Sequence, residues 1–325
     1  MKRRLLCFGF GYSARALARV LGPEWSITGT SRDEEPGVVP AGTSFRWLRF
    51  DRDRPLEPAA FAGVTHILIS VPPDESGDPV FDRHRDDIAA ISHLAWLGYL
   101  STTGVYGNRD GGWVDENSEL RPSGARGRWR AAAEAAWLDL QRERQVPVHV
   151  FRLAGIYGPG RSPFDALRAG TAKRIDKRGQ VFSRIHVDDI AQVLMASIVQ
   201  PRPGAVYNVC DDEPAAFADV IAHAAELLGI AAPPLVPFEA AGLSPIARSF
   251  YDDNKRVSNA LIKSELGVSL RYPTYRDGLA AILAAEAIQS RAGLEACPAP
   301  RHPASSAPAG GRGAAPATDP AKEEG

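Results

Sequence analysis

The residues Leu5-Leu6-Cys7-Phe8-Gly9-Phe10-Gly11-Tyr12-Ser13-Ala14 form an apolar run that leads directly into a glycine-rich turn. The apolar run ends at the first glycine, as a buried parallel strand does. One apolar helix face then follows, with the spacing i, i+3, i+4 and i+7, formed by Ala14, Leu17, Ala18 and Leu21. The stretch therefore predicts a strand, a tight turn and a helix, in that order.

This turn has the chemistry that holds the pyrophosphate of a dinucleotide. Gly9 permits the tight turn, Gly11 lets the backbone approach the phosphates, and the small Ala14 lets the helix pack on the strand. The N–H groups at the helix start then point at the phosphates. A purely structural glycine turn is the alternative. The predicted cofactor contacts in the turn are Gly9, Phe10, Gly11, Tyr12, Ser13 and Ala14.

The end of the second predicted strand favours NADP over NAD. NAD-binding folds place an acidic residue about 20 residues after the turn, where it binds the ribose hydroxyls. Thr30, Ser31 and Arg32 stand there instead, and an arginine binds a 2′-phosphate bidentately. The alternative is a solvated Arg32, with Asp33 or Glu34 supplying the acid after a small shift of register.

Strands and helices alternate along the rest of the chain, which predicts an α/β fold with a doubly wound parallel sheet. The expected strands are 25–30, 45–50, 65–71, 97–101, 148–153 and 206–209, and the expected helices are 80–94, 128–144, 187–198 and 215–228. Two residues near strand ends are further candidate cofactor contacts. Ser70 is one, and Asp51 is a candidate adenine neighbour or simply a loop cap.

The alternation also predicts the domain organisation. We expect a Rossmann domain over residues 1–154, completed by about 183–205, and a smaller C-terminal α/β substrate-binding subdomain over 155–182 and 206–290. Residues 291–325 are rich in Pro, Ala and Gly and show no hydrophobic periodicity, which is typical of a disordered tail.

The bulk composition is that of an ordinary soluble protein, with 325 residues, 44% of them hydrophobic, and a net charge of -1. No basic block suggests a nucleic-acid partner. No apolar stretch suggests a membrane span, and Arg15 and Arg19 interrupt any signal-peptide core. Cys7, Cys210 and Cys297 match no metal or CxxC spacing, so we expect no metal and a cytoplasmic location.

Four further segments occur in the order of a known family. They are Tyr99–Gly107 (YLSTTGVYG), Phe151–Gly160 (FRLAGIYGPG), Ile185–Ala191 (IHVDDIA) and Tyr207–Val209 (YNV). With the glycine turn they resemble the extended short-chain dehydrogenase/reductase superfamily, in particular its NAD-dependent epimerase/dehydratase group. The resemblance implies an NAD(P)-dependent oxidoreductase or epimerase that acts on a small polar or sugar-nucleotide-like substrate. It also implies a possible homodimer through helices near 82–95 and 128–144.

The resemblance places a catalytic hydroxyl at Thr102, but the family's YxxxK pair is missing. Arg126 stands at its Tyr position and Arg130 at its Lys position, and arginine is a poor proton shuttle. We therefore expect an atypical member of the family. The two arginines are candidates for binding an anion, or form an exposed helix face. Tyr106 and Tyr157 are alternative candidate proton donors in place of the missing tyrosine.

The resemblance implies a substrate pocket around Tyr157, Arg161 and His186, although His186 is equally expected as a structural residue before a helix start. Two classes of function remain open at this stage. An enzyme is favoured by Thr102 and by the substrate segment. A non-catalytic NADP-binding redox sensor or scaffold is favoured by Arg126 and Arg130.

Overall fold

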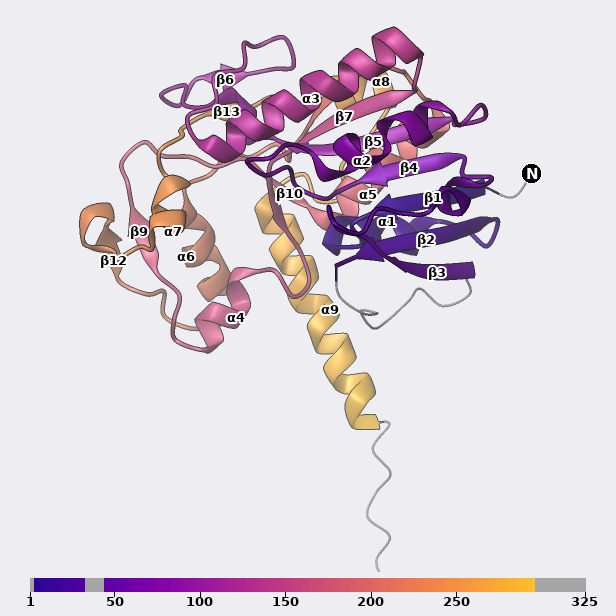
Figure 1. Cartoon of the computed structure of the whole chain (residues 1–325). Coiled ribbons are helices and arrows are strands. Elements are labelled where there is room, and N and C mark those ends of the chain that lie inside the picture. The colour runs from indigo at the N-terminus through magenta and orange to yellow at the C-terminus, as the bar shows by residue number, and fades with distance from the viewer. Residues whose placement is uncertain (1–2, 33–43, 296–325) are drawn as a thin grey trace, which may run out of the picture. The chain divides into compact units, whose positions relative to one another are not determined.

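The computed structural model describes residues 3–32 and 44–295 of the chain. Its central feature is a seven-stranded sheet in the order β11-β7-β5-β4-β1-β2-β3, in which every neighbouring pair is parallel. The strands are β1 (Arg3–Phe8), β2 (Trp25–Ser31), β3 (Ser44–Arg49), β4 (His66–Ile69), β5 (Trp96–Thr102), β7 (Val148–Leu153) and β11 (Val206–Val209). The predicted doubly wound α/β fold is confirmed, and Figure 1 shows the sheet with its helices.

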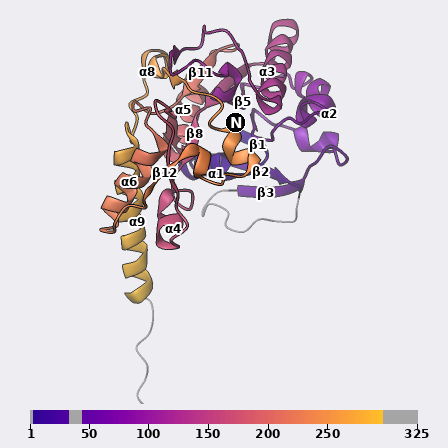
Figure 2. The same cartoon turned by 90° about the vertical axis from the view of Figure 1, so that its left-hand side faces the viewer.

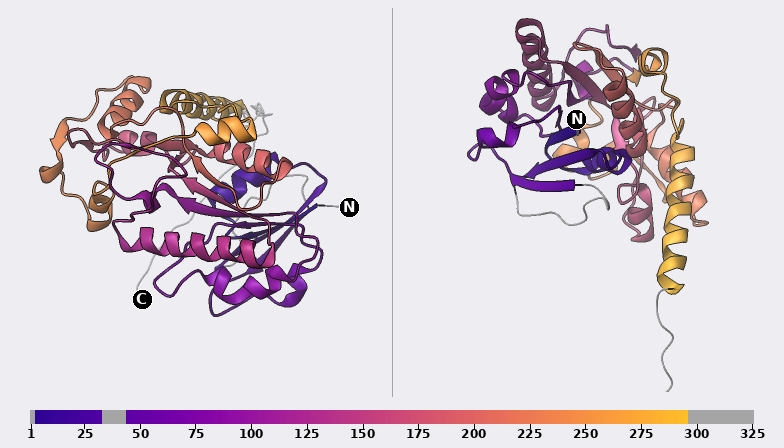
Figure 3. Two further views of the ribbon diagram at one scale, coloured as in Figure 1. Left: turned by 90° about the horizontal axis from the view of Figure 1, so that it is seen from above. Right: turned by 90° about the vertical axis from the view of Figure 1, so that its right-hand side faces the viewer.

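Helices cover both faces of this sheet (Figure 1, Figure 3). Helix α1 (Tyr12–Val20) packs on α5 (Val187–Val199) over one face, and α2 (Pro79–Ala89) packs on α3 (Ala125–Arg144) over the other. Side chains of β1 alternate between the two cores, because successive residues of a strand point to opposite faces. Leu5 and Cys7 pack with α1 and α5, whereas Leu6 and Phe8 pack with α2 and α3.

The sheet order places the candidate site at the carboxyl ends of the central strands. From β1 the chain runs outward to β2 and β3 and then returns to β4 on the other side of β1. Such a reversal opens a crevice at the carboxyl ends of the strands, where α/β proteins bind ligands. Gly9 follows β1 and Ser70 follows β4, so both lie at this switch point.

The remaining elements are short strand pairs, helices and 3₁₀ turns outside the seven-stranded sheet. Parallel pairs join β8 (Gly155–Tyr157) to β10 (Arg184–His186), β9 (Arg174–Asp176) to β12 (Leu235–Pro237), and β6 (Trp113–Val114) to β13 (Arg256–Val257). The helices are α4 (Pro163–Arg168), α6 (Phe217–Leu227), α7 (Pro245–Ser249), α8 (Ala260–Leu266) and α9 (Tyr275–Glu295), and the 3₁₀ turns are η1 (Pro58–Phe61), η2 (Thr103–Tyr106) and η3 (Phe238–Ala240). Figure 2 shows α4 and α6, which pack together.

The chain divides into two compact units, Met1–Ala285 and Glu286–Gly325. Helix α9 continues to Glu295, past residue 291, where the sequence predicted the tail to start. Residues 296–325 of that predicted tail lie outside the described residues, and the predicted boundary between Rossmann domain and substrate-binding subdomain stays a prediction. Among the described residues, no helix combines the length and apolarity needed to cross a membrane.

Candidate functional site

The glycine turn after β1 is held by two hydroxyl groups from neighbouring strands. Gly9 has a φ of +84°, and a Cβ there would lie 2.7 Å from Ser70 Oγ. The Gly9 N–H donates to Thr30 Oγ1 at 3.0 Å, and its carbonyl accepts from Ser70 Oγ at 2.6 Å. Thr30 is fully buried. Thr30, predicted as a cofactor contact, therefore stabilises the turn through the hydrogen bond between its hydroxyl and the Gly9 N–H.

The start of α1 is open to an anion. Gly11 is the N-cap of α1, and a Cβ placed on it would meet nothing within 4 Å. The first N–H groups of a helix lack partners in the helix and carry partial positive charge, which suits a phosphate. The residues present therefore fit the pyrophosphate of a dinucleotide, with Gly11 and Ser13 beside it.

The other side chains of the turn pack against protein. The Phe10 ring lies 4.8 Å from that of Phe45, and Ala14 is fully buried against the sheet. The Tyr12 hydroxyl donates to the Pro159 carbonyl at 2.9 Å, which joins the turn to the loop after β8. Phe10 and Ala14 are thus placed to serve a ligand through their backbone only.

Beyond the turn, Ser31 ends β2, and Arg32 is exposed without a hydrogen-bond or ion-pair partner among residues 3–32 and 44–295. Asp33 and Glu34, the alternative acids, lie outside the described residues. Asp51 accepts the N–H groups of Asp53 and Arg54 at 3.0 and 2.9 Å. Its carboxylate caps its own loop, which was the alternative to an adenine contact.

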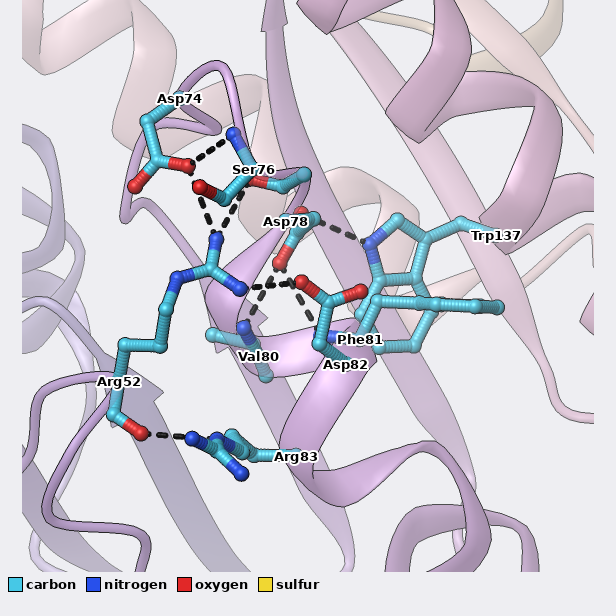
Figure 4. Close-up of polar contacts among 10 residues, drawn as sticks. Arg52, Asp74, Ser76, Asp78, Val80, Phe81, Asp82, Arg83 and Trp137 are labelled. Atoms are coloured by element: carbon cyan, nitrogen blue, oxygen red, sulfur yellow. Dashed lines mark hydrogen bonds and ion pairs between the residues drawn. The ribbon is translucent and has the colours of Figure 1, made fainter.

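An ionic cluster fixes the loops after β3 and β4, as Figure 4 shows. Arg52 pairs with Asp74 at 2.9 Å and also with Asp82 of α2. Asp78 caps α2 by accepting the N–H of Val80 at 2.8 Å, and its other oxygen accepts the indole N–H of Trp137 from α3 at 3.1 Å. These contacts hold the loop after β4, which begins at Ser70, in one position.

A cleft of about 1230 Å³ starts at the glycine turn and runs into the C-terminal half. Several residues that the sequence predicted for different roles lie on this one surface. They are Gly11, Tyr12, Ser13, Ser70, Thr102, Arg130, Tyr157 and Arg161. A cleft of this size accommodates a dinucleotide end together with a second small molecule.

Thr102 and Arg130 lie at the centre of the family's catalytic segment. The Thr102 Oγ1 accepts the Gly104 N–H at 3.1 Å, which leaves the hydroxyl hydrogen available to a ligand. The Arg130 guanidinium donates to the Leu100 carbonyl and lies 5.9 Å from the centroid of the Tyr99 ring. Arg130 is therefore already engaged by the protein on the wall of the cleft.

Tyr106 and Arg126 do not reach the cleft within the described part of the chain. Tyr106 is 0% exposed, donates to Asn208 Oδ1 at 2.7 Å and accepts from Arg152 Nη1 at 2.9 Å. Burial raises the pKa of its phenol. This placement argues against proton donation by Tyr106. Arg126 is exposed on the first turn of α3, which fits the alternative of an exposed helix face.

His186 is a structural residue in this fold. It is the N-cap of α5, because its Nδ1 accepts the Asp188 N–H at 3.2 Å. Burial lowers the pKa of His186 to about 4. Its ring lies 5.2 Å from that of Tyr157, behind the cleft wall. Of the predicted substrate residues, Tyr157 and Arg161 line the cleft, and Arg161 lies over the Tyr12 ring, toward the cofactor turn.

Sequence reasoning missed several polar residues that line the cleft, among them Arg184, Lys255 and Tyr275. Burial lowers the pKa of Lys255, which forms an ion pair with Asp253 at 3.2 Å. An available signal was Arg184 itself, a charged residue directly before the family segment that begins at Ile185. Lys255 and Tyr275 lie in segments without any motif.

No family model matches the chain. Protein YeeZ of Escherichia coli (strain K12) is 25% identical over 284 residues, which cover 83% of this chain and 97% of YeeZ. A protein from Streptomyces sp named 3-diazoavenalumate denitrifying reductase is 29% identical over 180 residues, which cover 51% of this chain and 58% of the reductase.

Solved structures are similar over most of the chain. A functionally unknown conserved protein from Silicibacter pomeroyi DSS is 54% identical, with a TM-score of 0.80 over 87% of this chain and 99% of its own. A protein from Methylobacillus flagellatus is 27% identical, with a TM-score of 0.65 over 88% of this chain and 99% of its own. Its given name is NAD-dependent epimerase/dehydratase. MoeE5, solved with UDP-glucuronic acid and NAD, shares the fold at 20% identity, with a TM-score of 0.72 over 88% and 99%.

The sheet order, the glycine turn at its switch point and these relatives agree with one another. The chain is therefore similar in sequence and in fold to a protein named as an NAD-dependent epimerase/dehydratase.

Proposed function

We propose that the protein is an NADP-dependent oxidoreductase or epimerase, an atypical member of the NAD-dependent epimerase/dehydratase group that works without the YxxxK pair. The observation that carries this proposal is the single cleft that joins Gly11 and Ser13 to Thr102 and then to Tyr157. A protein that only sensed its cofactor would have no need of a cleft that continues for so far beyond the cofactor turn.

The chain's own residues suit the cofactor in three places. The α1 N-terminus receives the pyrophosphate, Arg161 lies near that turn, and Ser31 with Arg32 is placed to bind a 2′-phosphate. When bound, the nicotinamide accepts or donates a hydride. The preference for NADP over NAD rests on Arg32 and on the absence of an acid from Thr30 to Arg32.

Proton transfer needs a different group from the family's tyrosine. Thr102 is positioned to donate a hydrogen bond to a substrate oxygen from the cleft wall. Burial raises the pKa values of Tyr157 and Tyr275, which makes these phenols weak acids, but it lowers the pKa of Lys255. An acid with a pKa nearer to neutrality is a better proton donor. We therefore propose Lys255, which forms an ion pair with Asp253 and lines the cleft, as the proton donor.

A second candidate function is a non-catalytic NADP-binding sensor. The observation that favours it is the contact of Arg130 with the Leu100 carbonyl, because a guanidinium held by the backbone cannot replace the family's lysine in proton transfer. Turnover separates the two functions.

The test is a screen of carbonyl compounds and sugar nucleotides, followed by the absorbance of the reduced nicotinamide. We expect turnover in the wild type, a large loss of kcat in Thr102→Ala and Lys255→Met, and unchanged NADPH binding in both variants. Binding of NADPH without turnover of any compound supports the sensor.

Titration of tryptophan fluorescence with NADPH and NADH tests the cofactor preference. Tighter binding of NADH, or an unchanged preference in Arg32→Ala, would exclude NADP as the first choice.

A further inference from the structure

Five buried polar side-chain atoms in the C-terminal half have no hydrogen-bond partner among the described residues. Three of them are Arg184 Nη2, the Tyr275 hydroxyl and Asp211 Oδ2, and the other two are His186 Nε2 and Asn208 Nδ2. Arg184 and Tyr275 line the cleft and are only 8% and 1% exposed. Buried polar groups are nearly always hydrogen-bonded, because leaving one unpaired costs its desolvation free energy. The atoms of Arg184 and Tyr275 mark a position prepared for a polar group that the described chain does not supply.

Arg184 is held so that one arm of its guanidinium stays free. Its Nη1 donates to the carbonyls of Phe182 and Ala215 at 2.8 and 3.0 Å. Its guanidinium carbon lies 6.0 Å from the ring centroids of both Phe182 and Tyr275. The side chain is therefore held through Nη1, and its Nη2 keeps no hydrogen-bond partner among the described residues.

This cation also lacks a bound counter-charge. Within the described residues Arg184 makes no ion pair, its Nη2 has no hydrogen-bond partner, and burial raises the pKa of the neighbouring Asp211 to about 8. The nearby lysines are already engaged. Lys255 pairs with Asp253, and Lys173 donates to the Ala241 carbonyl at 2.8 Å. Arg184 thus offers one free charged donor, which suits an anionic head with a single charge.

The surface next to this donor is apolar. Tyr275 packs in one hydrophobic cluster with Val220, Ile221 and Leu279, and all four line the cleft. Further apolar residues line the same cleft, namely Ala166, Ala172, Phe217, Leu243, Ala247 and Phe250. Of these residues, Ala166 comes from α4, Phe217 from α6 and Ala247 from α7, and Figure 2 shows α4 beside α6. A hydrocarbon body, rather than a polyhydroxylated sugar, fits such walls.

We propose that this part of the cleft binds an apolar carboxylic acid, with its carboxylate at Arg184 and Tyr275 and its hydrocarbon body against Val220, Ile221 and Leu279. This proposal rests on the proposed function in one respect only, namely that the bound acid is the substrate. Binding of the acid to this part of the cleft requires no cofactor. A diphosphate would need several free cationic donors, whereas Lys173 and Lys255 are held by the protein.

Calorimetric titration of the full chain with three probes tests this site. Cinnamate carries the carboxylate and an aromatic body, cinnamamide has the same body with a neutral head, and UDP has two phosphates without an apolar body. We expect cinnamate to bind about ten- to a hundredfold more tightly than cinnamamide, since a charge-assisted pair at Arg184 is lost with the amide. Equal affinities for the two, or UDP as the tightest of the three, would overturn the proposal.

Two variants and a control locate the effect. Tyr275→Phe removes only the unpartnered hydroxyl and should weaken cinnamate severalfold while leaving cinnamamide unchanged. Arg184→Gln should abolish the difference between the two probes. Arg161→Gln removes a cleft arginine at the glycine-turn end and should leave that difference intact. If Arg161→Gln abolishes the difference and Tyr275→Phe does not reduce it, the proposed site is wrong.

NADPH titration of the same samples separates this proposal from the proposed function. Normal NADPH binding with no cinnamate binding overturns the carboxylate site and leaves the dinucleotide function standing. Cinnamate binding that depends on Arg184, without any NADPH binding, supports the site and overturns the proposed function.

Discussion

The Gly9 amide donates a hydrogen bond to the Thr30 hydroxyl at 3.0 Å, which ties the turn after β1 to the end of β2. The Gly9 carbonyl accepts a second bond from Ser70, at the end of β4. Both backbone groups of one glycine are thus fixed by hydroxyls from two flanking strands. The protein therefore sets the shape of the turn before any ligand arrives, and the two glycines of the turn have separate tasks.

The first prediction separates these tasks with a matched pair of variants. Gly9→Ala places a Cβ at 2.7 Å from Ser70 Oγ on a backbone with φ of +84°, so it should lower the free energy of unfolding by about 1–3 kcal/mol. Gly11→Ala meets no atom within 4 Å and should lower it by less than about 1 kcal/mol, from weaker helix capping. Urea denaturation measures both.

The same pair should behave in the opposite way toward the cofactor. The Gly11→Ala methyl occupies the space where the pyrophosphate approaches, so NADPH affinity should fall about tenfold or more in a protein that is still folded. If Gly11→Ala binds NADPH like the wild type, the pyrophosphate does not lie on this turn.

The second prediction concerns the Thr30 hydroxyl. Thr30→Val keeps the side-chain volume but leaves the Gly9 N–H without its partner, which should cost about 1–3 kcal/mol of unfolding free energy. Thr30→Ser keeps the hydroxyl and should retain most of the stability. A Thr30→Val protein with wild-type stability and weakened NADPH binding would instead support the direct cofactor contact expected from the sequence.

Thr30 also illustrates what the sequence could and could not predict. The strand, the glycine turn and α1 were predictable, because apolar periodicity and glycine spacing are local properties of the chain. The direction of the Thr30 hydroxyl depends on the register between β1 and β2, which no local pattern contains. The same holds for Tyr106, since Asn208 and Arg152 come from distant strands. Arg184 was overlooked because an isolated arginine resembles a surface residue until its strand is placed.

The third prediction tests the role of Tyr106. Tyr106→Phe removes hydrogen bonds to Asn208 and Arg152, so the free energy of unfolding should fall by about 1–3 kcal/mol. Because the phenol lies outside the cleft, kcat on any substrate found in the screen should stay within about twofold of the wild type. A drop in kcat comparable to that of Thr102→Ala, in a folded Tyr106→Phe protein, would restore Tyr106 as the proton donor.

The fourth prediction concerns the buried ion pair behind the catalytic segment. Glu134 and Arg152 are 1% and 5% exposed and form an ion pair at 2.8 Å, and Ser101 donates to the same carboxylate. Glu134→Ala leaves a buried guanidinium without its partner and should cost about 3–5 kcal/mol. The double variant Glu134→Ala, Arg152→Met should lose clearly less than the sum of the two single changes. Additive losses would mean that the two charges are not coupled.

The fifth prediction is a loss of stability in acid that depends on His149. This residue is fully buried, its Nε2 accepts the Arg202 N–H at 2.8 Å, and burial lowers its pKa to about 4. The unfolded chain binds the proton at a pKa of about 6.5. Between these two values the unfolded state holds more protons than the folded state, so stability falls as the pH drops from about 6.5 to about 4. The full contribution of this histidine is at most about 3 kcal/mol.

His149→Gln keeps an acceptor for Arg202 and should flatten that part of the stability profile, measured by urea denaturation at each pH. His93→Gln, at an exposed histidine, is the matched control and should leave the profile unchanged. The slope is the decisive quantity, because the glutamine also changes packing against Trp96 and lowers stability at every pH alike. A His149→Gln profile as steep as that of the wild type would show that His149 does not cause the loss.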